Sequence, residues 1–470
     1  MNFFRPISIS LSPNTEKDDI RLALKLLFQP WDWKLNHYAT RPRSVGLEEE
    51  FKRYLGVKYA ISFNSGRSAL MAILDSLDIK KDDEVLLQGF TCNSAVIPIL
   101  AKGAKPVFVD VDDTINMDPE DLKKKITSKS KVTMIQHTFG WPAQIDEILK
   151  IAKQNNLFLV EDCAHSLGAK YGSRAERENH PAPSLEGAGS STFQPRYASG
   201  KVGTFGDVAF FSFGRDKIIS SVFGGLAVTN NEEIWERIKN FREKCDFPSN
   251  FWIFQQLLHP ILVNYLVLPA YGLNQYLGRI ILGLFHKLSI LSKGVYKKEK
   301  KGEIPKYFPK RFPNALATLA LNQFKKLEKF NNHRRKTASF YEKELKNTGF
   351  NLPLAKSQEG RTPAFMRYPI LVNFDTDEIL QKLRRKKIFL DDGWRKSPVV
   401  PPDTDIDKMG YLFGSCPQVE KVAQNIVNLP THINISEKEA KIIVNFLKSY
   451  GLQPTHRPSR EKHEYQGDKR

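Results

Sequence analysis

The chain has 470 residues, of which 41% are hydrophobic and 26% charged, and this ordinary globular composition allows two or three domains with a large buried core. Its net charge of +19 suits nucleic acid, an anionic membrane surface or an anionic substrate as partner, and composition alone does not choose among these. The four cysteines include no CxxC pair and no His/Cys group with zinc spacing, so the sequence predicts no metal site and favours reduced thiols.

Residues 1–45 are predicted to form an N-terminal arm with one short helix at about 18–28, and the start lacks the layout of a signal peptide. A large domain follows at 46–246. Apolar periodicity there predicts helices at 47–56, 67–77, 91–104 and 145–156, alternating with strands at 58–63, 83–90, 106–112, 131–136, 157–164, 207–213 and 224–230. This alternation predicts an α/β fold with a mostly parallel sheet flanked by helices, in which ligands sit at the carboxyl ends of the strands. Residues 173–200, rich in Gly, Ser and Pro, are expected to be a flexible loop.

Residues 247–308 form an insertion of a different kind, apolar first and lysine-rich afterwards. No charged residue occurs from Phe247 to Gly278. Pro260 and Pro269 are expected to divide this stretch into pieces too short to span a bilayer. One interpretation is a set of interfacial helices with the lysines on anionic lipid. The other is a helical flap packed on the enzyme or on a partner subunit, which needs no membrane.

The last part of the chain, 309–453, is predicted to be a smaller α+β domain. Its pattern indicates one or two helices at 312–345, a strand at 367–374, and helices at 376–387 and 436–451. The polar residues 454–470 are expected to be a disordered tail.

Two candidate contact sites lie where strands end. Ser65, Gly66 and Arg67 occupy a strand–turn–helix junction, where free N–H groups and the helix dipole favour an anion, although most Ser-Gly turns are only turns. Asp162 ends a strand, where its carboxylate is either functional or a cap for the residues that follow. His165 follows it closely, as packing or as a second ligand contact.

Lys217 is the main candidate for chemistry. A lysine after a strand is usually a surface charge, but this one lies between two apolar runs, where a lowered pKa would suit Schiff-base chemistry. Ser212, five residues earlier, is placed to bond a phosphate. The loop that holds Phe90 and Cys92 could cover a planar ring.

Six segments carry a family resemblance: FNSGRSALMAIL, DEVLLQGFTCNSAVIPILAKGAKPVFVDVD, HTFGWPAQIDEI, VEDCAHSLGAKYG, GTFGDVAFFSFGRDKIISSVFGGLAVTNN and NIVNLPTHINIS. In this order they resemble the DegT/DnrJ/EryC1/StrS family of sugar aminotransferases, which are fold-type I enzymes dependent on pyridoxal 5'-phosphate (PLP). The resemblance covers about 45–245 and 309–450.

The resemblance implies a role for each candidate. Lys217 would bind PLP as a Schiff base and move the proton between donor and acceptor carbons. Asp162 would pair with the ring nitrogen. Ser212 and the Ser65–Arg67 turn would hold the phosphate, and His165 would lie near the ring hydroxyl.

Two departures from the family pattern concern the cofactor. Cys92 stands where many members carry the aromatic residue that stacks on the ring, for which Phe90 is the candidate substitute. Pro309 stands where many members carry an asparagine that reaches the neighbouring subunit's cofactor, while Arg311 is kept.

The resemblance further implies that an amino group passes from an amino acid, glutamate or glutamine, to a nucleotide-linked keto-sugar, in a cytoplasmic homodimer. Peripheral contact of 247–301 with the inner face of the membrane stays open. No nucleic-acid partner is predicted, because no recognised binding motif occurs. A PLP-dependent sugar dehydratase stays an alternative, although such members typically carry histidine at the position of Lys217, and so does a catalytically silent sensor or scaffold.

Overall fold

The computed structural model describes residues 5–35, 43–172, 200–355 and 360–451. The predicted flexible loop, apart from residue 200, and the predicted tail lie outside these residues. The centre of the fold is a seven-stranded sheet in the order β2-β10-β9-β7-β6-β3-β5. Its strands are β2 (Tyr59–Phe63), β3 (Glu84–Gln88), β5 (Lys105–Val109), β6 (Ser130–Gln136), β7 (Phe158–Asp162), β9 (Val208–Ser212) and β10 (Gly225–Thr229).

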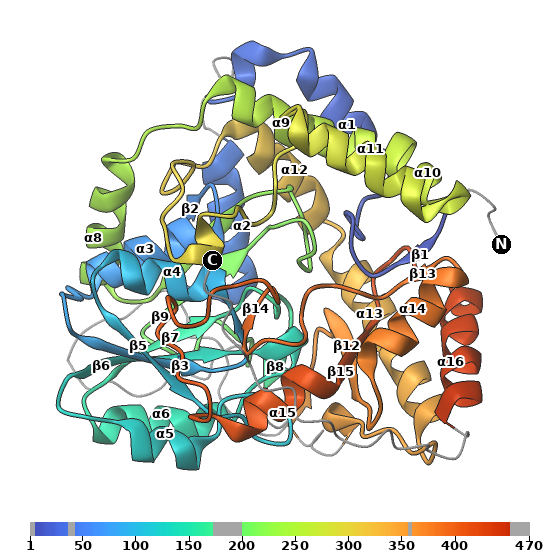
Figure 1. Cartoon of the computed structure of the whole chain (residues 1–470). Helices are drawn as coiled ribbons and strands as arrows, with labels where there is room; N and C mark the ends of the chain where they lie inside the picture. The colour runs from blue at the N-terminus through green and yellow to red at the C-terminus, as the bar shows by residue number, and fades with distance from the viewer. Residues whose placement is uncertain (1–4, 36–42, 173–199, 356–359, 452–470) are drawn as a thin grey trace, which may run out of the picture.

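The sheet confirms the predicted α/β class. β10 runs antiparallel to both of its neighbours, β2 and β9, and every other neighbouring pair is parallel. Central strands are buried on both faces, as Val85, Leu86 and Leu87 show, which is why they read as continuous apolar runs. Helices lie on both sides of the sheet in Figure 1: α3 (Gly66–Ser76) and α4 (Asn93–Ala101) on one side, α5 (Pro119–Lys125) and α6 (Ile145–Gln154) on the other.

The C-terminal part builds a second core. Its elements are α13 (Leu327–Leu345), β12 (Arg367–Leu371), α14 (Thr376–Arg385), β13 (Ile388–Phe389), β15 (Ile426–Pro430) and α16 (Glu437–Gly451). β12 and β15 pair antiparallel over a core that includes Tyr341 and Leu429. The preceding helix α12 (Asn314–Phe324), which the sequence analysis groups with this domain, buries its apolar face in the large core beside α2 (Arg43–Leu55).

The N-terminal arm joins both cores. Its helix α1 (Lys17–Leu27) agrees with the predicted 18–28 and packs along α9 (Asn250–Leu262) of the insertion. Its short strand β1 (Ile7–Ser8) pairs in parallel with β13 of the small domain. The arm therefore ties the large domain, the insertion and the small domain together.

The expectation that prolines divide the insertion is wrong. α9, the π-helical turn η3 (Val263–Val267) and α10 (Leu268–Leu273) form one helix of 24 residues that runs through Pro260 and Pro269. The widened π turn directly precedes α10, and Pro269 lies in the first turn of α10, where the missing N–H of a proline costs no helical hydrogen bond. In addition, the Asn264 side-chain amide donates to the Pro260 carbonyl at 2.8 Å. α11 (Gln275–Lys287) then folds back against α10.

This helix is long and apolar enough to cross a membrane, and among the described residues it is the one helix of which this is true. However, 56% of its most apolar window is buried within the protein, where it packs on α1 and α12. In this structure the helix therefore lies on the rest of the protein.

Candidate active site

The predicted site residues meet at one edge of the sheet. β2, β7 and β9 point the same way, so their carboxyl ends lie together and present the turn at Ser65, Asp162 and the Ser212–Lys217 loop. The strand register brings the ends of β2 and β9 close together, because Gly225 of β10, the strand between them, lies opposite both Phe63 and Ser212. The structure thus brings the separate sequence motifs to one place.

The turn at 65–67 and Ser212 form a cradle. α3 begins at Gly66, and the Ser65 hydroxyl caps it by accepting the Ser68 N–H at 3.1 Å. A side chain at Gly66 would begin 3.1 Å from the Ser212 Cβ, and one at Gly225 would begin 2.4 Å from the Gly66 nitrogen. Glycine at these positions keeps the first N–H groups of the helix open, as an anion site requires.

Lys217 is partly buried in a turn whose geometry is set by its N–H donating to the Gly214 carbonyl at 3.1 Å. Burial lowers the pKa of Lys217, while the neighbouring Cys92 and Asp162 raise it in part. A lysine with a lowered pKa carries more of the neutral amine that attacks a carbonyl.

Asp162 and His165 are both buried. Burial raises the pKa of Asp162, and its hydrogen bond from the Ala164 N–H, at 2.9 Å, lowers it in part, as does Lys217. The cap is therefore present in the structure, and the carboxylate also lies within electrostatic range of Lys217, as a functional role would require. The pKa of His165 is held well below its usual value, first by burial and then by the charge of Lys217.

The loop at 90–93 places its two candidates differently. Phe90 has no exposed surface, and its ring packs edge-on against Trp394 at 5.6 Å and Phe139 at 6.4 Å. Cys92 is partly exposed and affects the pKa of Lys217. Cys92 is thus the residue of this loop within electrostatic range of the lysine, while Phe90 belongs to a buried aromatic cluster in which His165 stacks on Phe139 at 5.9 Å.

Two residues near Lys217, Asn14 and Arg367, were not predicted from the sequence. The Asn14 side-chain Nδ2 donates to the Lys217 carbonyl, and the Asn14 Oδ1 accepts from Arg334 at 2.6 Å. Arg367, from β12, lies 3.7 Å from the Asp216 carboxylate and also pairs with Asp392. Both contacts join residues far apart in the chain, and no local pattern marks them.

The insertion reaches this edge as well. Arg67 donates to Glu299, to the Tyr307 hydroxyl and to the Gly294 carbonyl. Arg215 donates to the carbonyl and hydroxyl of Ser292 at 2.7 and 2.6 Å. The side chain of Arg67 is therefore engaged, which leaves its backbone for the predicted phosphate contact.

Arg311 is engaged within its own chain. Its guanidinium donates to the carbonyls of Arg242 and Glu243 at the end of α8 (Glu232–Glu243). Its backbone N–H also donates to the Asp246 carbonyl at 2.9 Å. In this chain, then, the residue that the family pattern retains anchors the segment after the insertion to the large domain.

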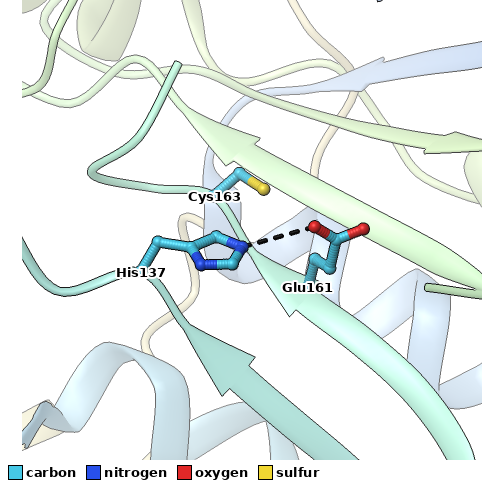
Figure 2. A group of neighbouring side chains, drawn as sticks. All are labelled: His137, Glu161 and Cys163. Atoms are coloured by element: carbon cyan, nitrogen blue, oxygen red, sulfur yellow. Dashed lines mark hydrogen bonds and ion pairs between the residues drawn. The ribbon is translucent and has the colours of Figure 1, made fainter. Parts of the chain in front are cut away.

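A polar cluster lies beneath Asp162. His137, Glu161 and Cys163 bring their ligand atoms within 4.8 Å of one another among the described residues (Figure 2). The two Glu161 oxygens accept the backbone N–H groups of 203, 205 and 206 at 2.7–2.8 Å, and His137 Nε2 approaches at 3.3 Å. His137 Nδ1 accepts the Ala143 N–H at 3.1 Å. These bonds give the cluster a structural task, which is to hold the 203–206 turn against β7.

The donor set fits PLP. The cradle at Gly66 offers N–H groups and a hydroxyl to a phosphate, and a side chain at Gly66 would fill it. A partly buried lysine and a buried carboxylate lie at the same edge, as a Schiff base and a protonated ring nitrogen require.

Known proteins share this architecture. The model of the DegT/DnrJ/EryC1/StrS aminotransferase family matches residues 33–251 and 287–448. A dTDP-3-amino-3,6-dideoxy-alpha-D-galactopyranose transaminase of Aneurinibacillus thermoaerophilus is 26% identical over 409 residues, which cover 86% of this chain and 89% of the relative. A GDP-perosamine synthase of Escherichia coli O157:H7 is 35% identical over 196 residues, which cover 42% of this chain and 47% of that protein.

Among solved structures, the fold is similar to Helicobacter pylori PseC, an aminotransferase involved in the biosynthesis of pseudoaminic acid. The TM-score is 0.65 at 21% identity, over 95% of this chain and 99% of PseC. At this identity the likeness concerns the fold alone. Because the family model matches most of the sequence, the chain belongs to the DegT/DnrJ/EryC1/StrS aminotransferase family and is a PLP-dependent aminotransferase.

Proposed function

We propose that the enzyme transfers an amino group from an amino acid, glutamate or glutamine, to a keto-sugar carried on a nucleotide. The observation that carries the proposal is the arrangement of Lys217 beside Asp162 at the edge that also holds the Gly66–Ser212 cradle. The curated relatives named as a dTDP-sugar transaminase and a GDP-perosamine synthase support the substrate class.

The chain's own residues divide the work. PLP, when bound, supplies an electron sink. Ser212 and the backbone of Gly66 and Arg67 bind its phosphate, and Asp162 keeps the ring nitrogen protonated. Lys217 holds the cofactor in the resting enzyme, and as a free amine it then removes a proton from the donor carbon and returns it to the acceptor carbon.

The remaining contacts orient these groups. His165, whose ring plane is set by stacking on Phe139, would lie on the hydroxyl side of the ring. Cys92 would lie at the ring face that an aromatic residue covers in many relatives, and a thiol would cover less of that face.

Replacing Lys217 with alanine tests the assignment. The variant should lose the visible absorption band of lysine-bound PLP and all measurable turnover, because no other amine occupies its place. Lys150→Ala, on an exposed part of α6, is the matched control and should keep both. Turnover that survives in Lys217→Ala would refute the proposal.

The spectrum also separates the alternatives. A band that shifts on adding glutamate or glutamine supports transamination and identifies the donor. A protein that takes up no chromophore from added PLP would indicate the silent scaffold, and a protein that converts a keto-sugar without an amino donor would indicate the dehydratase.

We also propose a cytoplasmic homodimer with peripheral membrane contact through 247–301. The resemblance supports the dimer, since fold-type I sites lie at a subunit interface. Exposed apolar side chains of the insertion, such as Tyr276 and Ile280, support the membrane contact. Sedimentation equilibrium tests the dimer, for which a monomeric active enzyme would be the contrary result.

A further inference from the structure

One edge of the molecule exposes an unusual number of apolar side chains. α11 presents a stripe at helical spacing, which comprises Tyr276, Leu277, Ile280, Leu284 and Leu288. These side chains are 41–65% exposed, and Gly278 is the buried residue of this helix. An exposed stripe of this width needs a partner, since water solvates it poorly.

Further exposed apolar side chains lie on elements distant in sequence. α1 and the turn after it expose Leu24, Phe28 and Trp31, and α9 exposes Phe251. α1 packs along α9, the Trp33 and Phe254 rings lie 6.2 Å apart, and α11 contacts η3, so these helices are neighbours, and they lie in the upper part of Figure 1. We call these exposed apolar residues, together with the stripe on α11 and with Tyr265 and Leu266 of η3, the apolar edge.

The insertion part of the apolar edge carries charge of one sign, whereas α1 also exposes Asp18, which pairs with Lys326. No Asp or Glu occurs from Phe247 to Lys298. Arg279 and Lys287 are exposed on α11, and Arg21 and Lys25 are exposed on α1. Aromatic and aliphatic side chains interspersed with cations are typical of helices that lie in the headgroup region of an anionic bilayer.

A basic cavity opens beside this edge. It has a volume of about 150 Å³ and lies between the start of α11 and the small domain, lined by Tyr271, Tyr276, Phe389, Arg384, Arg385 and Lys387. The Tyr271 and Phe389 rings meet edge-on at 5.3 Å and join the two walls.

The cations that line this cavity differ in whether a carboxylate neutralises them. Arg384 donates to Asp391 at 2.6 Å, but Arg385 and Lys387 form no ion pair within the described ranges. Two unneutralised cations with aromatic walls suit a phosphate group attached to an apolar body.

We propose that the apolar edge lies on an anionic lipid bilayer and that the cavity receives the phosphate of a lipid headgroup. Tyr276 belongs to both features, so one orientation of the protein satisfies both. The proposal deepens the peripheral membrane contact and is independent of the transamination chemistry.

Two other arrangements fit the observations less well. A two-fold pairing of two copies through this edge would place like charges opposite each other, which weakens association. Insertion of the 24-residue helix across the bilayer would strip it from α1 and α12, where most of its apolar window is buried.

Vesicle flotation of the intact, PLP-loaded enzyme tests the apolar edge. The enzyme should float with vesicles of phosphatidylcholine and phosphatidylglycerol and stay at the bottom with phosphatidylcholine alone. Ile280→Gln/Leu284→Gln should lower the partition coefficient at least about tenfold, because two aliphatic side chains no longer enter the lipid. Leu412→Gln/Phe413→Gln, at apolar residues that are even more exposed but lie outside the apolar edge, should leave it unchanged.

A second pair of variants tests the cavity. Arg385→Gln/Lys387→Gln should weaken partitioning about thirtyfold, since each cation near an anionic surface contributes about fivefold. Lys131→Gln/Lys150→Gln removes the same charge from exposed positions on β6 and α6 and should change partitioning far less. Equal losses in the two pairs would overturn the cavity's role and leave only a general effect of charge.

The same samples keep the two proposals separate. Each variant is assayed for its PLP band and its spectral response to glutamate. Loss of flotation with an intact band supports the docking proposal, and absence of flotation in the active wild-type enzyme overturns it while leaving the aminotransferase untouched. If Ile280→Gln/Leu284→Gln turns a dimer into a monomer, the apolar edge is a subunit interface and the lipid proposal fails.

Discussion

At the scale of single residues, the hydrogen bond from Asn14 to the Lys217 carbonyl is the contact that local sequence could not predict. Asn14 and Lys217 are separated by 203 positions, and Asn14 is itself held by the buried Arg334. Asn14 touches the backbone of the lysine and is a positioning residue. It fixes where the Lys217 side chain begins.

Asn14→Ala should therefore lower kcat about tenfold while PLP stays bound, because the lysine loop loses its anchor and the phosphate cradle does not. Stability should fall by about 1–3 kcal/mol, since Arg334 loses a buried partner. Steady-state kinetics and the visible spectrum measure the two effects.

Asn434→Ala is the control. Asn434 holds the same arm through the carbonyls of Pro13 and Thr15 but does not touch Lys217. If both variants lowered kcat equally, the arm as a whole and not the Asn14 contact would position the lysine.

At the scale of elements, the α10–α11 hairpin depends on one close approach. A side chain at Gly278 would begin 2.3 Å from the Tyr271 ring, so α11 can lie against α10 only with glycine there. Gly283, in the same helix, has open space around it.

Gly278→Ala should lower the free energy of unfolding by about 1–3 kcal/mol through overpacking. Gly283→Ala should raise it by up to about 1 kcal/mol, since alanine favours the helix. Thermal melts of both variants give the comparison, and a stabilised Gly278→Ala would contradict the packing seen here.

Elements were more predictable than the contacts between them. The strands and helices of the large domain follow local apolar periodicity, so sequence located β7, α6 and β9 and placed Asp162 and Lys217 at strand ends. The prediction that the prolines interrupt the helix was wrong because the effect of a proline depends on the local helix geometry, and the π turn before α10 accommodates Pro269. The contacts of Asn14 and Arg367 depend on how the N-terminal arm and the small domain dock, which periodicity does not encode.

At the scale of the whole molecule, buried histidines link stability to pH. Burial holds the pKa values of His165 and His259 well below their usual value, and it lowers that of His432 to about 3. These side chains stay neutral in the folded protein, but they bind protons in the unfolded chain below about pH 6.5. Stability from each is therefore present above pH 6.5 and is lost as the pH falls towards the folded pKa.

Each such histidine should cost about 1.4 kcal/mol between pH 7.5 and 5.5. His259 is the best probe, because neither ring nitrogen has a hydrogen-bond partner within the described structure. His259→Gln should reduce the drop in the urea midpoint over this range. The same drop in the variant and the wild type would show that His259 is not among the responsible groups.

The pairing of β1 with β13 has a consequence for biosynthesis. Ile7 leaves the ribosome early, but its partner Ile388 appears only when more than four-fifths of the chain has been made. Until then the arm has no sheet edge to join, and Asn434, which holds the carbonyls of Pro13 and Thr15, has not yet been made. The nascent chain therefore seats its N-terminal arm fully only after the small domain has emerged.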